Sequence, residues 1–238
     1  MQVTEVRIPL DEGGDIPGVL AMPEGEGPWP GVVMVHEAFG IEENMYIQIR
    51  RMCAAGYLVV MPDLFSRGGA RKCLTATFRA LSSGQGQAFV DVEAAKNMLL
   101  SRSDCTGKIG VIGFCMGGGF ALQLANRGYD VSSVNYGMLP KDIEAVLAGA
   151  CPVVGTFGGK DLTLKKAAAT LEEGLTRHGI PHDVKEYPRA NHAFMDVVPA
   201  GPKLMQPFMQ KVMGFRPYPE ETEDAWARIE AFFAEYLR

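Results

Sequence analysis

A cysteine lies between two glycines where an apolar run gives way to a helix-forming one. Residues 113 to 117 read Gly-Phe-Cys-Met-Gly, the pattern of a nucleophile elbow, G-x-S-x-G, with cysteine in place of serine. The glycines allow a sharp, strained turn that lifts the middle side chain clear of the sheet. The helix N-terminus that follows favours a thiolate. The pattern predicts that Cys115 is a nucleophile; the structural alternative is a buried cysteine beside a glycine-rich packing turn.

Two partners for this nucleophile follow in the chain. Asp161 ends an apolar run, and His192 comes shortly after the next run. In α/β-hydrolases the chain order is nucleophile, acid, histidine, and open α/β sheets place their sites at the carboxyl ends of strands. Taken alone, Asp161 is a typical helix N-cap and His192 a typical loop histidine. Together they predict a general base and the acid that orients it.

A fourth candidate, Glu37, lies in the loop after an early apolar run. This loop supplies the second oxyanion donor in α/β-hydrolases, so we expect the N–H groups of Ala38 and Met116 to converge on a developing oxyanion. A carboxylate beside the thiol favours the protonated thiol by charge repulsion and could later accept its proton. The alternative for Glu37 is an acid at the start of a helix. His36 and Glu37 also begin the zinc motif H-E-x-x-H, but position 40 is glycine and the motif fails.

The segments that must position these residues alternate between strand and helix patterns. Short apolar runs predict strands at residues 3–9, 18–22, 31–36, 57–61, 108–114, 131–136, 152–157 and 182–187. Apolar residues spaced three and four apart predict helices at 45–53, 88–99, 168–175 and 226–236, with another after Cys115. Such alternation predicts an α/β fold with a doubly wound, mostly parallel sheet of about eight strands. The first two strands are expected to form an N-terminal antiparallel hairpin.

Composition and charge exclude several classes of protein. The 238 residues carry 23 basic and 28 acidic side chains, and this net charge of −5 disfavours nucleic acid or an anionic membrane as partner. With 47% hydrophobic residues and no linker or repeat, we expect one folded domain over residues 1–238. Five cysteines at irregular spacing and a start without an apolar leader predict a cytoplasmic protein. The uncharged stretch 109–126 holds five glycines, which fit strand, turn and helix better than a membrane span.

Five short segments together resemble the dienelactone hydrolase family. They are His-Glu-Ala-Phe-Gly at 36–40, Pro-Asp-Leu-Phe at 62–65, Gly-Phe-Cys-Met-Gly-Gly at 113–118, Gly-Gly-Lys-Asp at 158–161 and Asn-His-Ala-Phe at 191–194. The resemblance extends from about residue 3 to the terminal helix. It implies an α/β-hydrolase fold and a triad of Cys115, His192 and Asp161, with Glu37 modulating the thiol. It also implies hydrolysis of a lactone, dienelactone to maleylacetate, without cofactor or metal.

The substrate-binding residues carry over less well. Family enzymes bind the substrate carboxylate with arginines, one of them four residues after the catalytic histidine, where this chain has Asp196. Arg79 is a loose match to another, and Phe39 and Phe194 are further candidates for substrate contact. Arg189 could compensate for the missing arginine. We therefore predict an acyl-enzyme hydrolase of small lactones or esters that disfavours anionic substrates, with no partner other than its substrate, acting as a monomer or small homo-oligomer.

Two other functions stay open on the sequence alone. One is a carboxylesterase or thioesterase whose apolar acyl pocket contains Phe194, Met195, Phe208 and Met209, a set that ordinary core packing also explains. The other is a non-catalytic redox sensor in which Cys115 is oxidised; it is disfavoured because a sensor needs neither Asp161 nor an oxyanion hole. Residues 193–219, rich in Pro, Met and Phe, match no element, and loops of this length are usually functional.

Overall fold

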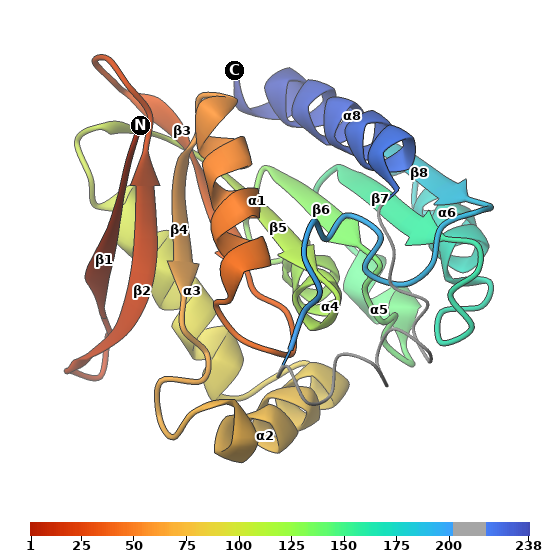
Figure 1. Ribbon diagram of the computed structural model, residues 1–238, viewed down its shortest axis with the longest axis horizontal. Helices are drawn as coiled ribbons and strands as arrows, with labels where there is room; N and C mark the ends of the chain where they lie inside the picture. The colour runs from red at the N-terminus through yellow and green to blue at the C-terminus, as the bar shows by residue number, and fades with distance from the viewer. Residues whose placement is uncertain (202–217) are drawn as a thin grey trace.

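Eight strands form one mixed sheet in the computed structural model, which describes residues 1–201 and 218–238 (Figure 1). The strands are β1 (Gln2–Pro9), β2 (Asp15–Met22), β3 (Trp29–Val35), β4 (Leu58–Pro62), β5 (Cys105–Phe114), β6 (Val131–Asn135), β7 (Val153–Gly158) and β8 (His182–Tyr187). Their order is β1-β2-β4-β3-β5-β6-β7-β8. β1 pairs with β2, and β2 with β4, in antiparallel fashion, whereas all other neighbours are parallel. The predicted fold class is confirmed.

The central strands read as continuous apolar runs because both of their faces are covered. Val32, Val33, Met34 and Val35 of β3 are each 0% exposed, as expected for parallel strands between two layers of helices. The edge strand β1 instead alternates between exposed and partly buried positions. Burial therefore falls from the middle of the sheet towards its hairpin edge.

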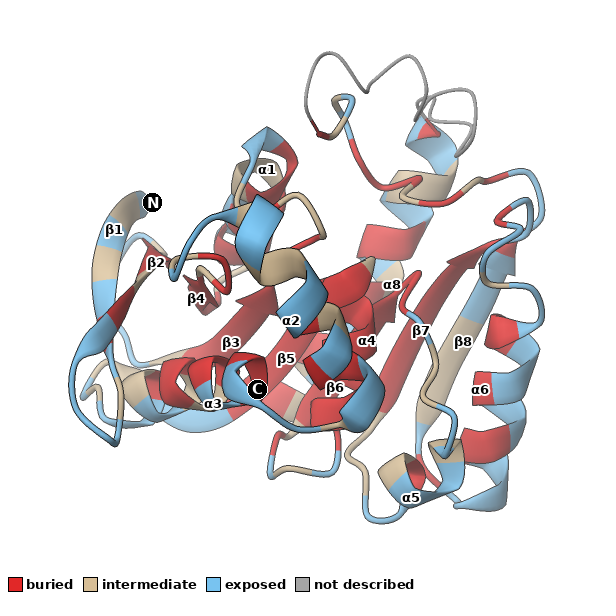
Figure 2. Cartoon of the chain, turned by 90° about the horizontal axis from the view of Figure 1, so that it is seen from below, coloured by how far each residue is buried: buried red, intermediate tan, exposed pale blue. Residues whose placement is uncertain are grey.

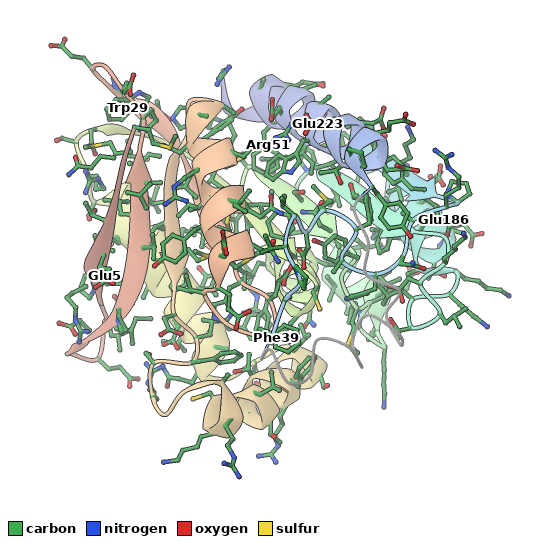
Figure 3. All side chains as sticks on the ribbon, in the orientation of Figure 1. Glu5, Trp29, Phe39, Arg51, Glu186 and Glu223 are labelled. Atoms are coloured by element: carbon green, nitrogen blue, oxygen red, sulfur yellow. The ribbon has the colours of Figure 1, made fainter. Side chains whose placement is uncertain are left out.

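Helices cover both faces of the sheet. They are α1 (Glu43–Ala54), α2 (Ala70–Ser83), α3 (Gln87–Leu100), α4 (Met116–Leu124), α5 (Ile143–Leu147), α6 (Ala167–Arg177) and α8 (Pro219–Leu237). α1 and α8 pack on one face, and α3, α4, α5 and α6 on the other. α4 is buried along its whole length, whereas α1, α3 and α6 bury one side and expose residues on the other (Figure 2). Arg51 of α1 and Glu223 of α8 form an ion pair of 2.6 Å between the two helices (Figure 3). No helix among the described residues has the length and apolar character needed to cross a membrane.

Two helices, α2 and α5, are missing from the sequence-based prediction. α2 does carry apolar residues at helical spacing, such as Leu74, Phe78 and Leu81, so a periodic signal was present in the sequence and was overlooked. α5 has five residues, which is too short for the pattern to repeat. The other predicted helices and all eight strands are present, with ends that differ by a few residues.

The parallel strands bring the candidate residues to one edge of the sheet. Glu37 follows β3, Cys115 follows β5, Tyr136 follows β6, Asp161 follows β7 and His192 follows β8. Because these five strands are parallel neighbours, their carboxyl ends lie along the same edge, which is where open α/β sheets place their sites.

Candidate active site

The turn that carries Cys115 has the strained geometry of a nucleophile elbow. Cys115 adopts φ 53° and ψ −115° between β5 and α4, a left-handed conformation that side-chain-bearing residues rarely adopt. The glycines on either side are required by space. A Cβ at Gly113 would lie 1.9 Å from the Gly117 carbonyl oxygen, and one at Gly117 would lie 2.1 Å from the Val35 carbonyl oxygen. Glycine at both positions therefore allows the close backbone approach on which this turn depends.

His192 joins Cys115 to Asp161 in an unbroken chain of polar contacts. His192 Nε2 lies 3.1 Å from Cys115 Sγ, although the two residues are 77 positions apart. His192 Nδ1 lies 2.5 Å from Asp161 Oδ2. Because an ionised carboxylate can only accept, Nδ1 carries the proton and Nε2 faces the sulfur. Thr163 holds the other Asp161 oxygen, donating from its N–H at 2.9 Å and its hydroxyl at 2.6 Å.

The charges of these groups favour an ionised site. Burial alone would raise the Asp161 pKa, but hydrogen bonds from His192 and Thr163 outweigh it, and the pKa is lowered. Burial alone would lower the His192 pKa, but the charge of Cys115 and the hydrogen bonds to Asp161 and Cys115 raise it to about 10. An imidazolium is therefore stable between the sulfur and the Asp161 carboxylate at neutral pH.

Glu37 is buried beside the triad, and His36 fixes its backbone. Glu37 is only 4% exposed. Leu64 donates its N–H to His36 Nε2 at 3.1 Å, so the proton of the neutral ring is on Nδ1, which donates to the Glu37 carbonyl at 2.7 Å. Burial lowers the His36 pKa and keeps the ring neutral. The sequence analysis assigned His36 no role; its position at the end of β3, next to Glu37, is the signal that could have found it.

The two expected oxyanion donors lie on neighbouring strand ends. Val35 of β3 pairs with Gly113 of β5, and Ala38 and Met116 each come three residues after that pair. Met116 is the first residue of α4, where an N–H has no partner within the helix. The convergence of both N–H groups on one oxyanion stays a prediction.

Asp196 does not present the negative charge that its sequence position suggested. It is 3% exposed, and neither of its carboxyl oxygens has a hydrogen-bond partner. Burial raises the pKa of Asp196 well above its ordinary value, and the nearby charge of Glu37 raises it further. Both effects favour the protonated carboxyl, and the side chain is buried rather than open to substrate. The repulsion of an anionic substrate by Asp196 therefore stays a prediction that this burial does not support. The sequence could not reveal this, because the burial comes from segments distant in the chain.

Side chains of α1 hold the loop that contains Asp196. Gln48 donates to the Met195 carbonyl at 2.9 Å. Asn44 accepts from the N–H groups of Val197 and Val198, both at 3.0 Å, and donates to the Val198 carbonyl at 2.8 Å. Asn44 and Gln48 are themselves 2% and 1% exposed. The first part of the stretch 193–219, which matched no element in the sequence, is thus anchored on a helix more than 140 residues earlier.

The predicted substrate-contacting residues differ in how far they are exposed. Phe194 is 1% exposed and packs against Tyr136, Tyr187 and Tyr218 in the core. Met195 is 0% exposed. Of the four residues predicted to line an acyl pocket, Phe194 and Met195 are therefore core residues. Phe208 and Met209 lie outside the described residues. Phe39 is half-buried, and a Cβ at Gly201 would lie 2.9 Å from its ring (Figure 3).

The two candidate arginines have different surroundings. Arg79 is exposed on α2 and lines a cavity of about 360 Å³, whose lining includes neither Cys115 nor His192. Arg189 is engaged by Glu220 and Glu221 at 3.6 and 3.1 Å. Among residues 1–201 and 218–238, no three His, Cys, Asp or Glu side chains form an arrangement that could hold a metal ion.

Comparisons with known proteins place the chain in a family and match its fold. The sequence model of the dienelactone hydrolase family matches residues 16–237. A protein of Methylorubrum extorquens, named provisionally as a carboxymethylenebutenolidase, is 29% identical over 98% of this chain and 80% of its own. The carboxymethylenebutenolidase of Pseudomonas putida is 29% identical over 74% of this chain and 80% of its own. The solved structure of a dienelactone hydrolase-like promiscuous phosphotriesterase from metagenomic libraries has a TM-score of 0.81 at 20% identity, covering 100% of this chain and 99% of that one, a likeness of fold.

Proposed function

The chain belongs to the dienelactone hydrolase family, and we propose that it hydrolyses small lactones or esters through an acyl-enzyme on Cys115. The observation that carries the proposal is the contact of 3.1 Å between His192 Nε2 and the Cys115 sulfur, at an elbow whose φ is 53°. A base at hydrogen-bond distance from a thiol, itself oriented by a third group, is the arrangement that nucleophilic catalysis requires. A redox sensor gains nothing from the Asp161–His192 contact.

The reaction proceeds in two halves. The Cys115 thiolate attacks the carbonyl carbon, and the N–H groups of Ala38 and Met116 stabilise the oxyanion. The carbon–oxygen bond to the leaving alkoxide then breaks, and His192 gives the alkoxide a proton; in a lactone this opens the ring. In the second half, His192 takes a proton from water, the hydroxide attacks the thioester, and the thiolate leaves as the carboxylic acid is formed. Asp161 holds the imidazolium through both halves.

Glu37 adjusts the charge around the sulfur. Burial raises the pKa of Glu37, while its interaction with Asp196 and the charge of His192 lower it. An ionised Glu37 opposes the thiolate and favours the resting thiol. When substrate enters, Glu37 can accept the thiol proton, leaving the electron pair on the sulfur as the nucleophile.

Neutral substrates fit the described surroundings better than anionic ones. Three apolar side chains follow the strand ends near the triad and are exposed: Met138 after β6, Leu162 next to Asp161, and Val197 in the loop after His192, at 49%, 75% and 56%. Of the candidate arginines, Arg189 is paired with two glutamates, and Arg79 is exposed and lines the cavity on α2. A clamp on a substrate carboxylate, worth about 1.5–3 kcal/mol as a charged hydrogen bond, is thus not supplied by these two residues.

The test compares a carboxylated lactone with its methyl ester. We expect kcat/KM for the methyl ester to exceed that for the free acid by roughly tenfold or more, since ~1.4 kcal/mol corresponds to a factor of ten. The Cys115→Ala variant should hydrolyse neither compound, and Cys73→Ala, which changes another partly exposed thiol, should hydrolyse both at the wild-type rate. A tenfold preference for the free acid would refute the neutral-substrate proposal, and full activity in Cys115→Ala would refute the nucleophile.

A further inference from the structure

Three polar groups without partners are buried together behind the triad. Both oxygens of Asp196, Oε1 of Glu37 and the hydroxyl of Tyr136 are buried and make no hydrogen bond. Tyr136 is 0% exposed and adopts φ 40° directly after β6. Leaving a buried polar group unpaired costs about 1–3 kcal/mol, so three such groups side by side call for a shared explanation.

Hydrogen bonds hold the backbone on both sides of Asp196 and at Glu37. The Asp196 N–H donates to the Ala193 carbonyl at 3.0 Å and closes a turn after His192. Asn44 and Gln48 anchor the residues on both sides of Asp196. Glu37 is fixed through its carbonyl, which accepts from the Gly40 N–H at 3.0 Å as well as from His36. The two carboxyl groups are thus brought together by separate elements.

The charged groups around the pair permit only one negative charge. Glu37, Cys115 and Tyr136 face Asp196, while Asp196, His192 and Glu42 face Glu37. Glu42 adds negative charge and His192 adds positive charge, and a thiolate formed at Cys115 would add a further negative charge. A second ionised carboxyl would therefore lack compensation. Burial raises the pKa of both carboxyls, and that of Asp196 is raised further by the charge of Glu37.

We infer that Asp196 is a positioning residue that holds one proton and shares it with Glu37, so that the pair presents a single negative charge to Cys115. The shared proton supplies the donor that the buried oxygens lack. The inference deepens the proposed function and rests on it for the role of Glu37. When Glu37 accepts the thiol proton, the sulfur–hydrogen bond breaks, an oxygen–hydrogen bond forms, and the pair passes from one proton to two. Asp196 itself touches neither the sulfur nor the substrate in this step.

Substitutions that keep or remove the donor test the inference. Asp196→Asn resembles the protonated carboxyl, because its amide can still donate to Glu37; Asp196→Ala cannot. The readout is the rate of Cys115 alkylation by iodoacetamide against pH, followed by peptide mass spectrometry. Burial raises the pKa of Cys53 to about 11 and that of Cys151 to about 12, so these thiols react slowly. Glu37→Gln identifies the titration of Glu37: the step in the plot of alkylation rate against pH that this variant lacks is assigned to Glu37.

We expect that transition to move upwards by one pH unit or more in Asp196→Ala and by less than half a unit in Asp196→Asn. An equal shift in both variants would overturn the inference, because it would mean that the ionisable group of Asp196 is needed. No shift in either would show that Asp196 does not act through Glu37.

Infrared spectra of the folded proteins provide a measurement that does not depend on the alanine variant. At pH 7 the wild type should show the carbonyl band of a protonated carboxylic acid, and Asp196→Asn should lack this band. Absence of the band from the wild type, or its persistence in Asp196→Asn, would overturn the inference. Neither readout needs an ester substrate. A protein that shows both effects but hydrolyses no ester refutes the proposed function alone, and an active hydrolase without them refutes only the shared proton.

Discussion

The loop after β7 and the loop after β8 each bury one aspartate near His192, and the pKa values of the two side chains are shifted in opposite directions. Asp161 is 4% exposed and Asp196 3%. Asp161 accepts three hydrogen bonds, one from His192 and two from Thr163, and its pKa is lowered. Asp196 accepts none and its pKa is raised. Burial to the same extent therefore does not decide the charge of a carboxyl group; the donors that surround it do.

The difference also concerns how each loop is held. Asp161 and Thr163 form a local turn, within three residues of chain. The Asp196 loop is held by Asn44 and Gln48, which belong to α1, more than 140 residues earlier in the chain. A local turn can be recognised in a sequence, whereas an anchor of this kind cannot.

The largest expected effect comes from removing the donor that distinguishes the two aspartates. His192→Ala takes away the base and one donor to Asp161, and kcat should fall by roughly 10⁴–10⁶, as it does when one member of a catalytic triad is removed. The matched control is His182→Ala, since His182 Nδ1 contacts only the Ile180 carbonyl at 2.7 Å and Nε2 lies 3.4 Å from Thr176. Steady-state ester hydrolysis measures both. A greater loss in His182→Ala would show that the chain order nucleophile, acid, histidine was misassigned.

The same substitution at both aspartates tests their comparison directly. Asp161→Asn should lower kcat by roughly 10³–10⁴, because the amide no longer holds His192 in the required tautomer. Asp196→Asn should lower it by less than about tenfold, because a protonated carboxyl and an amide both donate. The ratio of the two kcat values is the measurement. Equal losses would mean that Asp196 is ionised in the working enzyme.

Stability against pH should change with opposite sign in these two variants. The lowered pKa of Asp161 contributes stability above the ordinary aspartate value of ~3.9, and this is lost as pH falls through the lowered folded value. The raised pKa of Asp196 gives a contribution that is complete below ~3.9 and is lost as pH rises towards the raised folded value. At pH 8, Asp161→Asn should therefore be less stable than wild type and Asp196→Asn more stable, each by ~1–3 kcal/mol.

Urea unfolding at pH 4 and pH 8 measures this difference. In Asp196→Asn the decline in stability between the two pH values should be smaller than in wild type. Destabilisation of Asp196→Asn at pH 8 would contradict a protonated Asp196.

The smallest effect concerns the distant anchor. Asn44→Ala leaves two N–H groups and one carbonyl of the Asp196 loop unpaired, which should lower the free energy of unfolding by about 1–3 kcal/mol. Asn126→Ala is the control, since its single contact to the Ala145 carbonyl is long, at 3.3 Å, and exposed; it should change stability by less than about 0.5 kcal/mol. Similar values for both variants would remove the distinction between a locally held and a distantly held loop.

The sequence by itself determined the sheet, the elbow and the order of the triad. Fully buried strands read as apolar runs, and the Gly-Phe-Cys-Met-Gly turn has one geometry because a Cβ at either glycine would collide with backbone. Since parallel strands end at one edge, Cys115, Asp161 and His192 could be placed together from their positions after three parallel strands of one sheet, β5, β7 and β8. These features depend on local spacing, which a sequence displays.

Only the tertiary structure decided the burial and the raised pKa of Asp196, the burial of Phe194 and the position of Arg79 on an exposed helix face. The sequence suggested a carboxylate facing substrate, an aromatic pocket wall and a carboxylate-binding arginine. The structure instead gives a buried acid beside Glu37, a core residue among three tyrosines, and an exposed arginine on a helix that the sequence analysis did not include. The physical reason is common to all three: a side chain's exposure and ionisation depend on which distant groups surround it. No spacing within the chain records those neighbours.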